Sequence, residues 1–188
     1  GADTALRHMP ADLSRARAAL KAAGYDGTKV VVLSPADVPT IHPMGEVTAD
    51  LLMRLGMNVE FAAMDWSTLV ARRANREATD KGGWSIFHTW LVGPDLTSPA
   101  VNFAVRGSGQ KGWFGWADDA KIEELRDAWF ATTDAAASKK AADAVQARAF
   151  DFVPYVPTAQ FILPTAYRTN LSGLIIAPIT LMWNVEKK

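Results

Sequence analysis

The chain has 188 residues, no cysteine, and 20 acidic residues that balance 20 basic ones. This balance argues against a basic surface for nucleic acid or an anionic membrane, and no apolar run is long enough for membrane insertion. The lack of cysteine excludes thiol catalysis, disulfide bonds and zinc sites built from cysteine.

The first ten residues contain neither an initiator methionine nor the basic and apolar regions of a signal peptide. We therefore expect residues 1–10 to be the remnant of a linker, and the chain to be a piece of a longer protein.

The first half of the sequence predicts helices that alternate with strands. The expected helices cover residues 12–23, 44–55 and 66–78, and the expected strands cover residues 29–34, 57–61 and 84–91. The inward face predicted for the second helix consists of Val47, Leu51, Leu52 and Leu55. Short connections between the elements predict an α/β fold in which a parallel or mixed sheet is flanked by helices.

The second half begins with residues 92–117, which are rich in glycine, show little periodicity and are too long for a passive turn. We expect this stretch to be a functional loop. An antiparallel pair of helices is predicted next, capped by Asp118 and Asp134. Strands are expected at residues 158–163, 171–178 and 181–185.

Tryptophan is concentrated in the middle of the chain. Six of the seven tryptophans lie between Trp66 and Trp129, and four of them bracket residues 93–100, where Asp95 is the one acid. Indole rings offer rigid apolar area with one N–H donor, and a carboxylate among them can hold a cation. This pattern is typical of a binding surface more than of a reactive centre, although core packing is the alternative for each ring.

From this pattern we predict a ligand-binding set that consists of His88, Trp90, Asp95, Trp113 and Trp116. His88 is included because alternate residues of a strand share a face, which places it with Trp90. A hydrogen-bonded core histidine is the competing interpretation of this residue.

Catalytic and metal motifs have little support. The histidines are not at metal-ligand spacing, residues 107–112 match G-x-G-x-x-G without a strand, turn and helix around them, and no G-x-S-x-G elbow occurs. We expect no catalytic residue, no metal and no cofactor. The alternative is an α/β enzyme in which Asp95 or Asp65 works with His88 as an acid/base pair.

Several segments, in order, resemble those of the family 5 extracytoplasmic solute-binding proteins, the dipeptide and oligopeptide receptors of ABC transporters. The similar segments are residues 12–27, 51–60, 64–70, 83–99, 114–125, 147–157 and 171–174. The resemblance runs from about residue 11 to the end of the chain, and its specificity comes from the order and spacing of the pieces together.

The resemblance implies that residues 1–188 form a single C-terminal ligand-binding lobe, of the type II periplasmic-binding-protein fold, in a receptor with two lobes. It also implies a periplasmic location, a peptide or related small solute, and a membrane permease as partner of the full-length receptor. We expect the signal sequence of such a receptor to be absent from this chain. Solutes in this family also include sugars, opines and metal complexes.

The family's peptide receptors commonly place an acid three residues after a tryptophan, where it meets the ligand's α-amino group. Here Gly93 stands three residues after Trp90, and the acid comes at Asp95. This departure leaves the amine contact, and with it peptide specificity, open.

Overall fold

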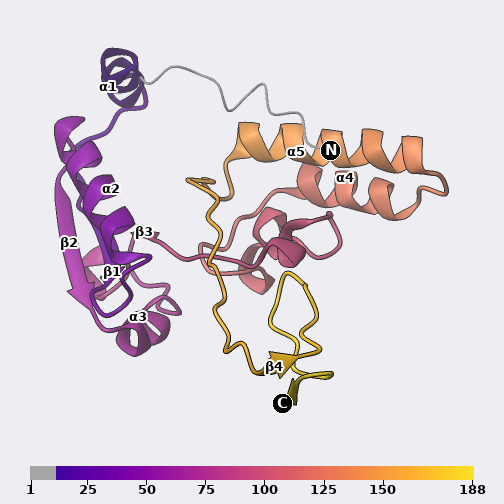
Figure 1. Ribbon diagram of the computed structural model, residues 1–188. Coiled ribbons are helices and arrows are strands. Elements are labelled where there is room, and N and C mark those ends of the chain that lie inside the picture. Colours follow the sequence, from indigo (N-terminus) through magenta and orange to yellow (C-terminus); the bar gives the residue numbers. More distant parts are fainter. Residues whose placement is uncertain (1–11) are drawn as a thin grey trace. The chain divides into compact units, whose positions relative to one another are not determined.

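The computed structural model describes residues 12–188, which divide into two compact units, residues 12–90 and 91–188 (Figure 1). Within the described range, no helix combines the length and the apolar character needed to cross a membrane.

The first unit alternates helices and strands as the sequence predicts. Its elements are α1 (Leu13–Ala22), β1 (Val30–Pro35), α2 (His42–Arg54), β2 (Val59–Met64), α3 (Trp66–Arg72), the 3-10 turn η2 (Thr79–Lys81) and β3 (Ile86–Phe87). The helix α3 is shorter than predicted. Soon after Arg72 the side chain of Asn75 accepts a hydrogen bond from the N–H of Glu77, a local turn that competes with the helix.

The three strands form a parallel sheet with β1 in the centre, in the order β2-β1-β3. Val31, Val32, Leu33 and Ser34 of β1 have no exposed surface. A central parallel strand is covered on both faces, so its sequence is a continuous apolar run and not an alternation of apolar and polar residues. Because all three strands run the same way, their carboxyl ends meet at one edge of the sheet.

The helix α2 packs through a face that only partly matches the predicted one, since Leu52 and Leu55 are half-buried as expected but Val47 and Leu51 are not. Gly45 and Ala49 are its buried residues, whereas Val47 is 69% exposed and Leu51 is 41% exposed. A Cβ atom at Gly45 would lie 2.6 Å from the Oγ of Ser34 in β1. The helix contacts the sheet through its smallest residues because the two backbones approach closely there, and the prediction for Val47 and Leu51 was wrong.

The second unit begins with three 3-10 turns, continues with two long helices and ends with two short strands. Its elements are η3 (Gly93–Leu96), η4 (Phe103–Val105), η5 (Gly109–Lys111), α4 (Ala120–Phe130), α5 (Ala135–Phe152), β4 (Leu171–Ser172) and β5 (Glu186–Lys187). The helices α4 and α5 lie side by side as the predicted hairpin (Figure 1). Residues 92–117 are held against α4, because Gly107 N–H donates to Glu123 and Arg126 donates to the carbonyl of Pro99.

Asp119, and not the predicted Asp118, is the N-cap of α4. Its carboxylate accepts the N–H of Ile122 at 2.7 Å and pairs with Arg148 of α5. The hydrogen bond from Arg148 lowers the pKa of Asp119 below its ordinary value. Asp118 remains exposed. Because Asp119 pairs with Arg148, the residue that caps α4 also links α4 to α5.

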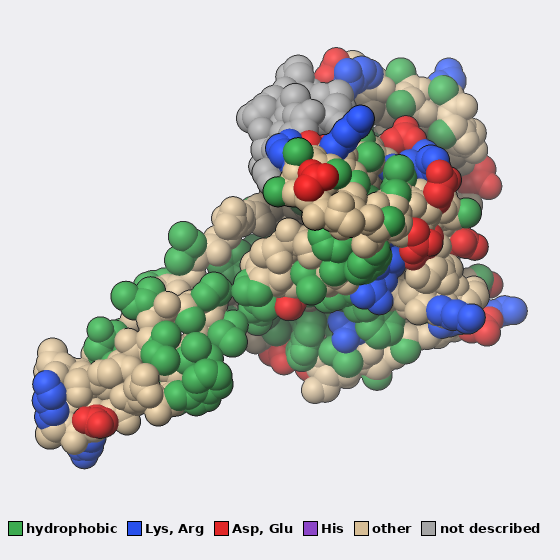
Figure 2. Space-filling model, turned by 90° about the vertical axis from the view of Figure 1, so that its right-hand side faces the viewer, with side chains coloured by type: hydrophobic (Ala, Val, Ile, Leu, Met, Phe, Trp, Pro, Cys, Tyr) green, Lys and Arg blue, Asp and Glu red, His purple; other side chains and the backbone are tan. Residues whose placement is uncertain are grey.

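Residues 154–168 contain neither helix nor strand, so the strand predicted at residues 158–163 is not formed. Farther along, β4 pairs antiparallel with β5, with Leu171 opposite Lys187. Many hydrophobic side chains of this last stretch are open on the surface (Figure 2). Those at least 36% exposed are Val153, Val156, Phe161, Ile162, Leu163, Tyr167, Ile175, Ile176, Ile179, Met182 and Trp183.

Candidate functional site

The candidate site lies at the carboxyl edge of the sheet in residues 12–90. Along the chain, β2 is added on one side of β1, and β3 is then added on the other side. The chain therefore leaves β1 toward one side of the sheet and leaves β2 toward the other side, so these two connections diverge at this edge. In open α/β sheets, ligands bind outside the carboxyl ends of the strands at such a switch point.

A cavity of about 350 Å³ lies at this edge, lined by Val38, Ile41, Trp66, Thr89 and Trp90. We call it the edge pocket. Val38 and Ile41 come from the connection between β1 and α2, Trp66 is the first residue of α3, and the other two follow β3. Each of the three parallel strands thus supplies part of the lining, through the residues that come just after it.

Trp66 is held by several neighbours. Its backbone N–H donates to the side chain of Asp37 at 2.8 Å, and the guanidinium carbon of Arg73 lies 5.8 Å from the ring centroid. Asp65 before it caps α3 by accepting the N–H of Thr68. The backbone of Trp66 is thus held by hydrogen bonds, and its ring has Arg73 as a neighbour. This part of the pocket wall is therefore formed before a ligand arrives.

The other residues of the lining differ in their exposure to solvent. Trp90 is 47% exposed, whereas Ile41 is only 2% exposed. The edge pocket therefore combines a buried aliphatic side chain with an indole that is open to solvent. Large apolar area of this kind is stabilised when a ligand removes it from water.

His88 faces α2. It is 8% exposed, and its Nε2 lies 2.9 Å from the hydroxyl of Thr48. Burial lowers the pKa of His88, which favours the neutral ring. This environment is that of the hydrogen-bonded core histidine, the second interpretation offered by the sequence, and His88 is not among the residues that line the edge pocket.

The other three predicted ligand-binding residues belong to the second unit. Asp95 lies in η3 and is half-buried. Trp113 packs edge-on against Phe103, with ring centroids 5.0 Å apart. Trp116 has a φ of 49°, a left-handed conformation that costs a non-glycine residue about 1–2 kcal/mol. The backbone N–H of Trp116 donates to the carbonyl of Trp113. A ligand-binding role for these three residues stays a prediction.

Four residues of the edge pocket were missed by the sequence reasoning, namely Val38, Ile41, Thr89 and Trp66. Their common signal is position, since Val38, Ile41 and Trp66 follow the ends of predicted strands and Thr89 lies near the end of the strand predicted at residues 84–91. The residues at or just after the ends of parallel strands therefore carry the signal, whereas the tryptophan content of the sequence points only to the aromatic members.

The residues of the acid/base alternative have separate hydrogen-bond partners. The Asp65 carboxylate accepts the N–H and the hydroxyl of Thr68, and these bonds lower the pKa of Asp65. His88 is bonded to Thr48. Across residues 12–188, no group of three His, Asp or Glu side chains is arranged to hold a metal ion.

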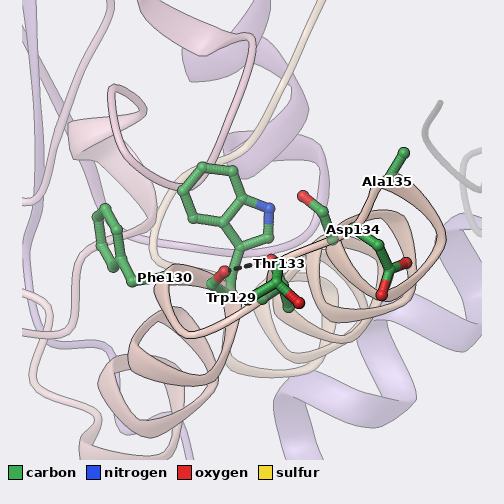
Figure 3. A pocket seen from close by; sticks show the side chains of 7 residues that line it. Trp129, Phe130, Thr133, Asp134 and Ala135 are labelled. Carbon is green, nitrogen blue, oxygen red and sulfur yellow. Dashed lines mark hydrogen bonds between the residues drawn. The ribbon is translucent and has the colours of Figure 1, made fainter.

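A second hollow, of about 340 Å³, lies at the turn between α4 and α5 (Figure 3). Its polar groups serve the turn itself, because Thr132 donates to the carbonyl of Trp129, and Asp134 caps α5 by accepting the N–H of Ala137. We attribute this hollow to the geometry of the helical hairpin.

No protein-family model matches the chain. It is 37% identical over 176 residues to a probable peptide ABC transporter periplasmic-binding protein of Sinorhizobium fredii. The match covers 94% of this chain and 33% of the relative, so the chain spans about a third of the length of the curated relative it matches.

Among solved structures, a dipeptide-binding protein of Pseudoalteromonas in complex with Met-Leu matches 94% of this chain and 36% of its own, with a TM-score of 0.70 and 20% identity. The PBP AgaA of A. tumefaciens, in complex with agropinic acid, matches 76% of this chain and 29% of its own, with a TM-score of 0.59 and 20% identity. These comparisons confirm the fold class and the resemblance seen in the sequence.

Proposed function

We propose that this chain, a homologue of part of the peptide ABC transporter periplasmic-binding proteins, is a solute-binding lobe of an importer's receptor and that its solute is a peptide. The observation that carries the proposal is the edge pocket, which places Trp66 and Trp90 at the switch point of the sheet. The receptor would act in the periplasm and deliver its solute to a membrane permease. Residues 1–188 would serve as a single lobe.

Binding without reaction is favoured by the chemistry of the edge pocket. Its lining is four apolar side chains and the hydroxyl of Thr89. Such a surface can remove a solute group from water, but it supplies no general base and no activated nucleophile. We therefore propose that the protein is not an enzyme.

The choice of a peptide rests on the curated relative, whose name describes a peptide transporter. The fold by itself leaves the solute open, since the two structural neighbours hold Met-Leu and agropinic acid. Asp95 is our candidate for the partner of a peptide's amino group, with Trp113 and Trp116 as further contacts. A carboxylate attracts an ammonium group through charge, and this attraction strengthens when water is excluded.

The test is a titration of the full-length protein with defined dipeptides, monitored by tryptophan fluorescence. Mass spectrometry of the peptides before and after the titration shows whether they are cleaved. We expect a saturable change in emission and intact peptides. Trp90→Ala should weaken binding by about tenfold or more, because the substitution removes a large apolar contact.

Trp183→Ala is the matched control. This tryptophan is 83% exposed, belongs to the other unit and lies outside the edge pocket, so its loss should leave affinity within about twofold. Cleavage of the peptides would contradict the receptor proposal and support the alternative, an α/β enzyme. A folded protein that binds none of the dipeptides would refute the proposal.

A further inference from the structure

We infer that the edge pocket receives one large, uncharged, apolar side chain of the solute and discriminates against charged ones. This inference rests on the proposed function and goes beyond it by naming the class of peptide. It is carried by the composition, the size and the rigidity of the lining.

The composition excludes a charged guest. None of the described residues that line the edge pocket is ionisable, and their only hydrogen-bonding side-chain groups are the hydroxyl of Thr89 and the indole N–H groups of Trp66 and Trp90. The hydroxyl of Thr89 already has the carbonyl of Trp90 at 3.5 Å as an acceptor within the chain. An ammonium or carboxylate group placed there would lose water without gaining an ion pair, which is strongly unfavourable.

The size points to a side chain and not to a whole solute. At about 350 Å³ the edge pocket is near the lower end of the range for small-molecule sites, roughly 300–1,000 Å³. A branched aliphatic or an aromatic side chain can occupy such a space, while the peptide backbone stays outside it. Each methylene group that the guest buries should strengthen binding by a factor of about four.

The rigidity makes the preference selective. Ile41 is buried at the start of α2, and its N–H donates to the carbonyl of Val38 at 2.9 Å. The backbone N–H of Trp66 donates to Asp37, and its ring lies beside Arg73. A wall with these constraints cannot readily turn a polar group toward a charged guest, so the apolar surface persists whichever peptide arrives.

The experiment is isothermal titration of the full-length protein with two dipeptide series, Ala-Xaa and Xaa-Ala, in which Xaa is Ala, Val, Leu, Phe, Asp or Lys. Two series are needed because either residue of the peptide can supply the guest. We expect the affinity in one series to rise by about tenfold or more from Ala to Leu or Phe, and to fall at least as much for Asp and Lys.

A designed variant tests the location. Val38→Asp puts a carboxylate on the wall of the edge pocket and should move the preference toward Lys, changing the ratio of Lys to Leu affinity by about tenfold or more. The matched control is Val47→Asp, since Val47 is 69% exposed on α2 and lies outside the pocket. The control should keep the preference of the unmodified protein. Circular dichroism of both variants verifies the fold.

The outcomes separate the two claims. If dipeptides bind with affinities that do not depend on Xaa, or if both aspartate variants behave alike, the inference about the edge pocket is overturned while the proposed function stands. If no dipeptide binds to the folded protein, the proposed function fails and the inference fails with it.

Discussion

The imidazole of His88 is buried beside Thr48, and its burial has a consequence for stability. Burial lowers the pKa of His88 in the folded state, whereas an unfolded chain has the ordinary value of about 6.5. Below that pH the unfolded state binds more protons than the folded one. The free energy of unfolding should therefore fall as the pH drops through about 6.5, and recover as the pH rises.

The measurement is urea denaturation at pH 7.5 and pH 5.5 of the unmodified protein and of His88→Gln. Glutamine keeps a hydrogen-bonding group near Thr48 but does not titrate. We expect the loss of stability between the two pH values to be smaller in the variant. Equal losses in both proteins would show that His88 does not contribute to the pH dependence.

At the scale of the elements, the packing of α2 on the sheet depends on the missing side chain of Gly45. In an isolated helix, alanine is favoured over glycine by about 1 kcal/mol. Here the added Cβ atom would lie 2.6 Å from the Oγ of Ser34 and 2.9 Å from its Cβ. The hydroxyl of Ser34 is itself engaged with His42 at 2.8 Å, so it cannot simply turn away.

We therefore predict that Gly45→Ala lowers the free energy of unfolding by about 1–2 kcal/mol in spite of the better helix propensity. Chemical denaturation measures the change. Val47→Ala, on the exposed face of the same helix, should stay within about 0.5 kcal/mol of the unmodified protein. A stabilised Gly45→Ala variant would mean that α2 does not approach β1 as closely as described.

At the scale of the whole molecule, the 188-residue chain carries an unusual amount of open apolar surface after residue 152. Ile162 is 88% exposed, Trp183 is 83% exposed, and Ile176 is fully exposed. Soluble proteins rarely leave large contiguous apolar patches open, and such surface binds apolar dyes and promotes association.

We expect the chain to bind 8-anilinonaphthalene-1-sulfonate in its folded state, and the triple substitution of Ile162, Ile176 and Trp183 by serine to remove roughly half of the dye fluorescence or more. The control is serine at three exposed polar positions of the same stretch, Thr158, Gln160 and Thr180. Similar dye binding by the two triple variants would place the apolar surface elsewhere.

The local structure followed from the sequence because its causes are local. The helix expected at residues 12–23 and the strand expected at residues 29–34 each depend on residues a few positions apart, and the structure forms them as α1 and β1. Of the predicted ligand-binding residues, Trp90 lies on the edge pocket. The resemblance to the peptide receptors was also present in the sequence alone, and the comparisons confirmed it.

Only the tertiary structure decided which helix faces are buried and which residues distant in sequence are in contact. Asp119, which caps α4, is also paired with Arg148, 29 residues later in α5, and this pairing across the helical hairpin was not predicted from the sequence. The inward face of α2 is set by the closeness of Ser34, and the edge pocket exists because parallel strands bring Val38, Trp66 and Trp90 to one edge. Contacts between residues far apart in sequence leave no periodic pattern along the chain, so they are determined only when the chain is folded.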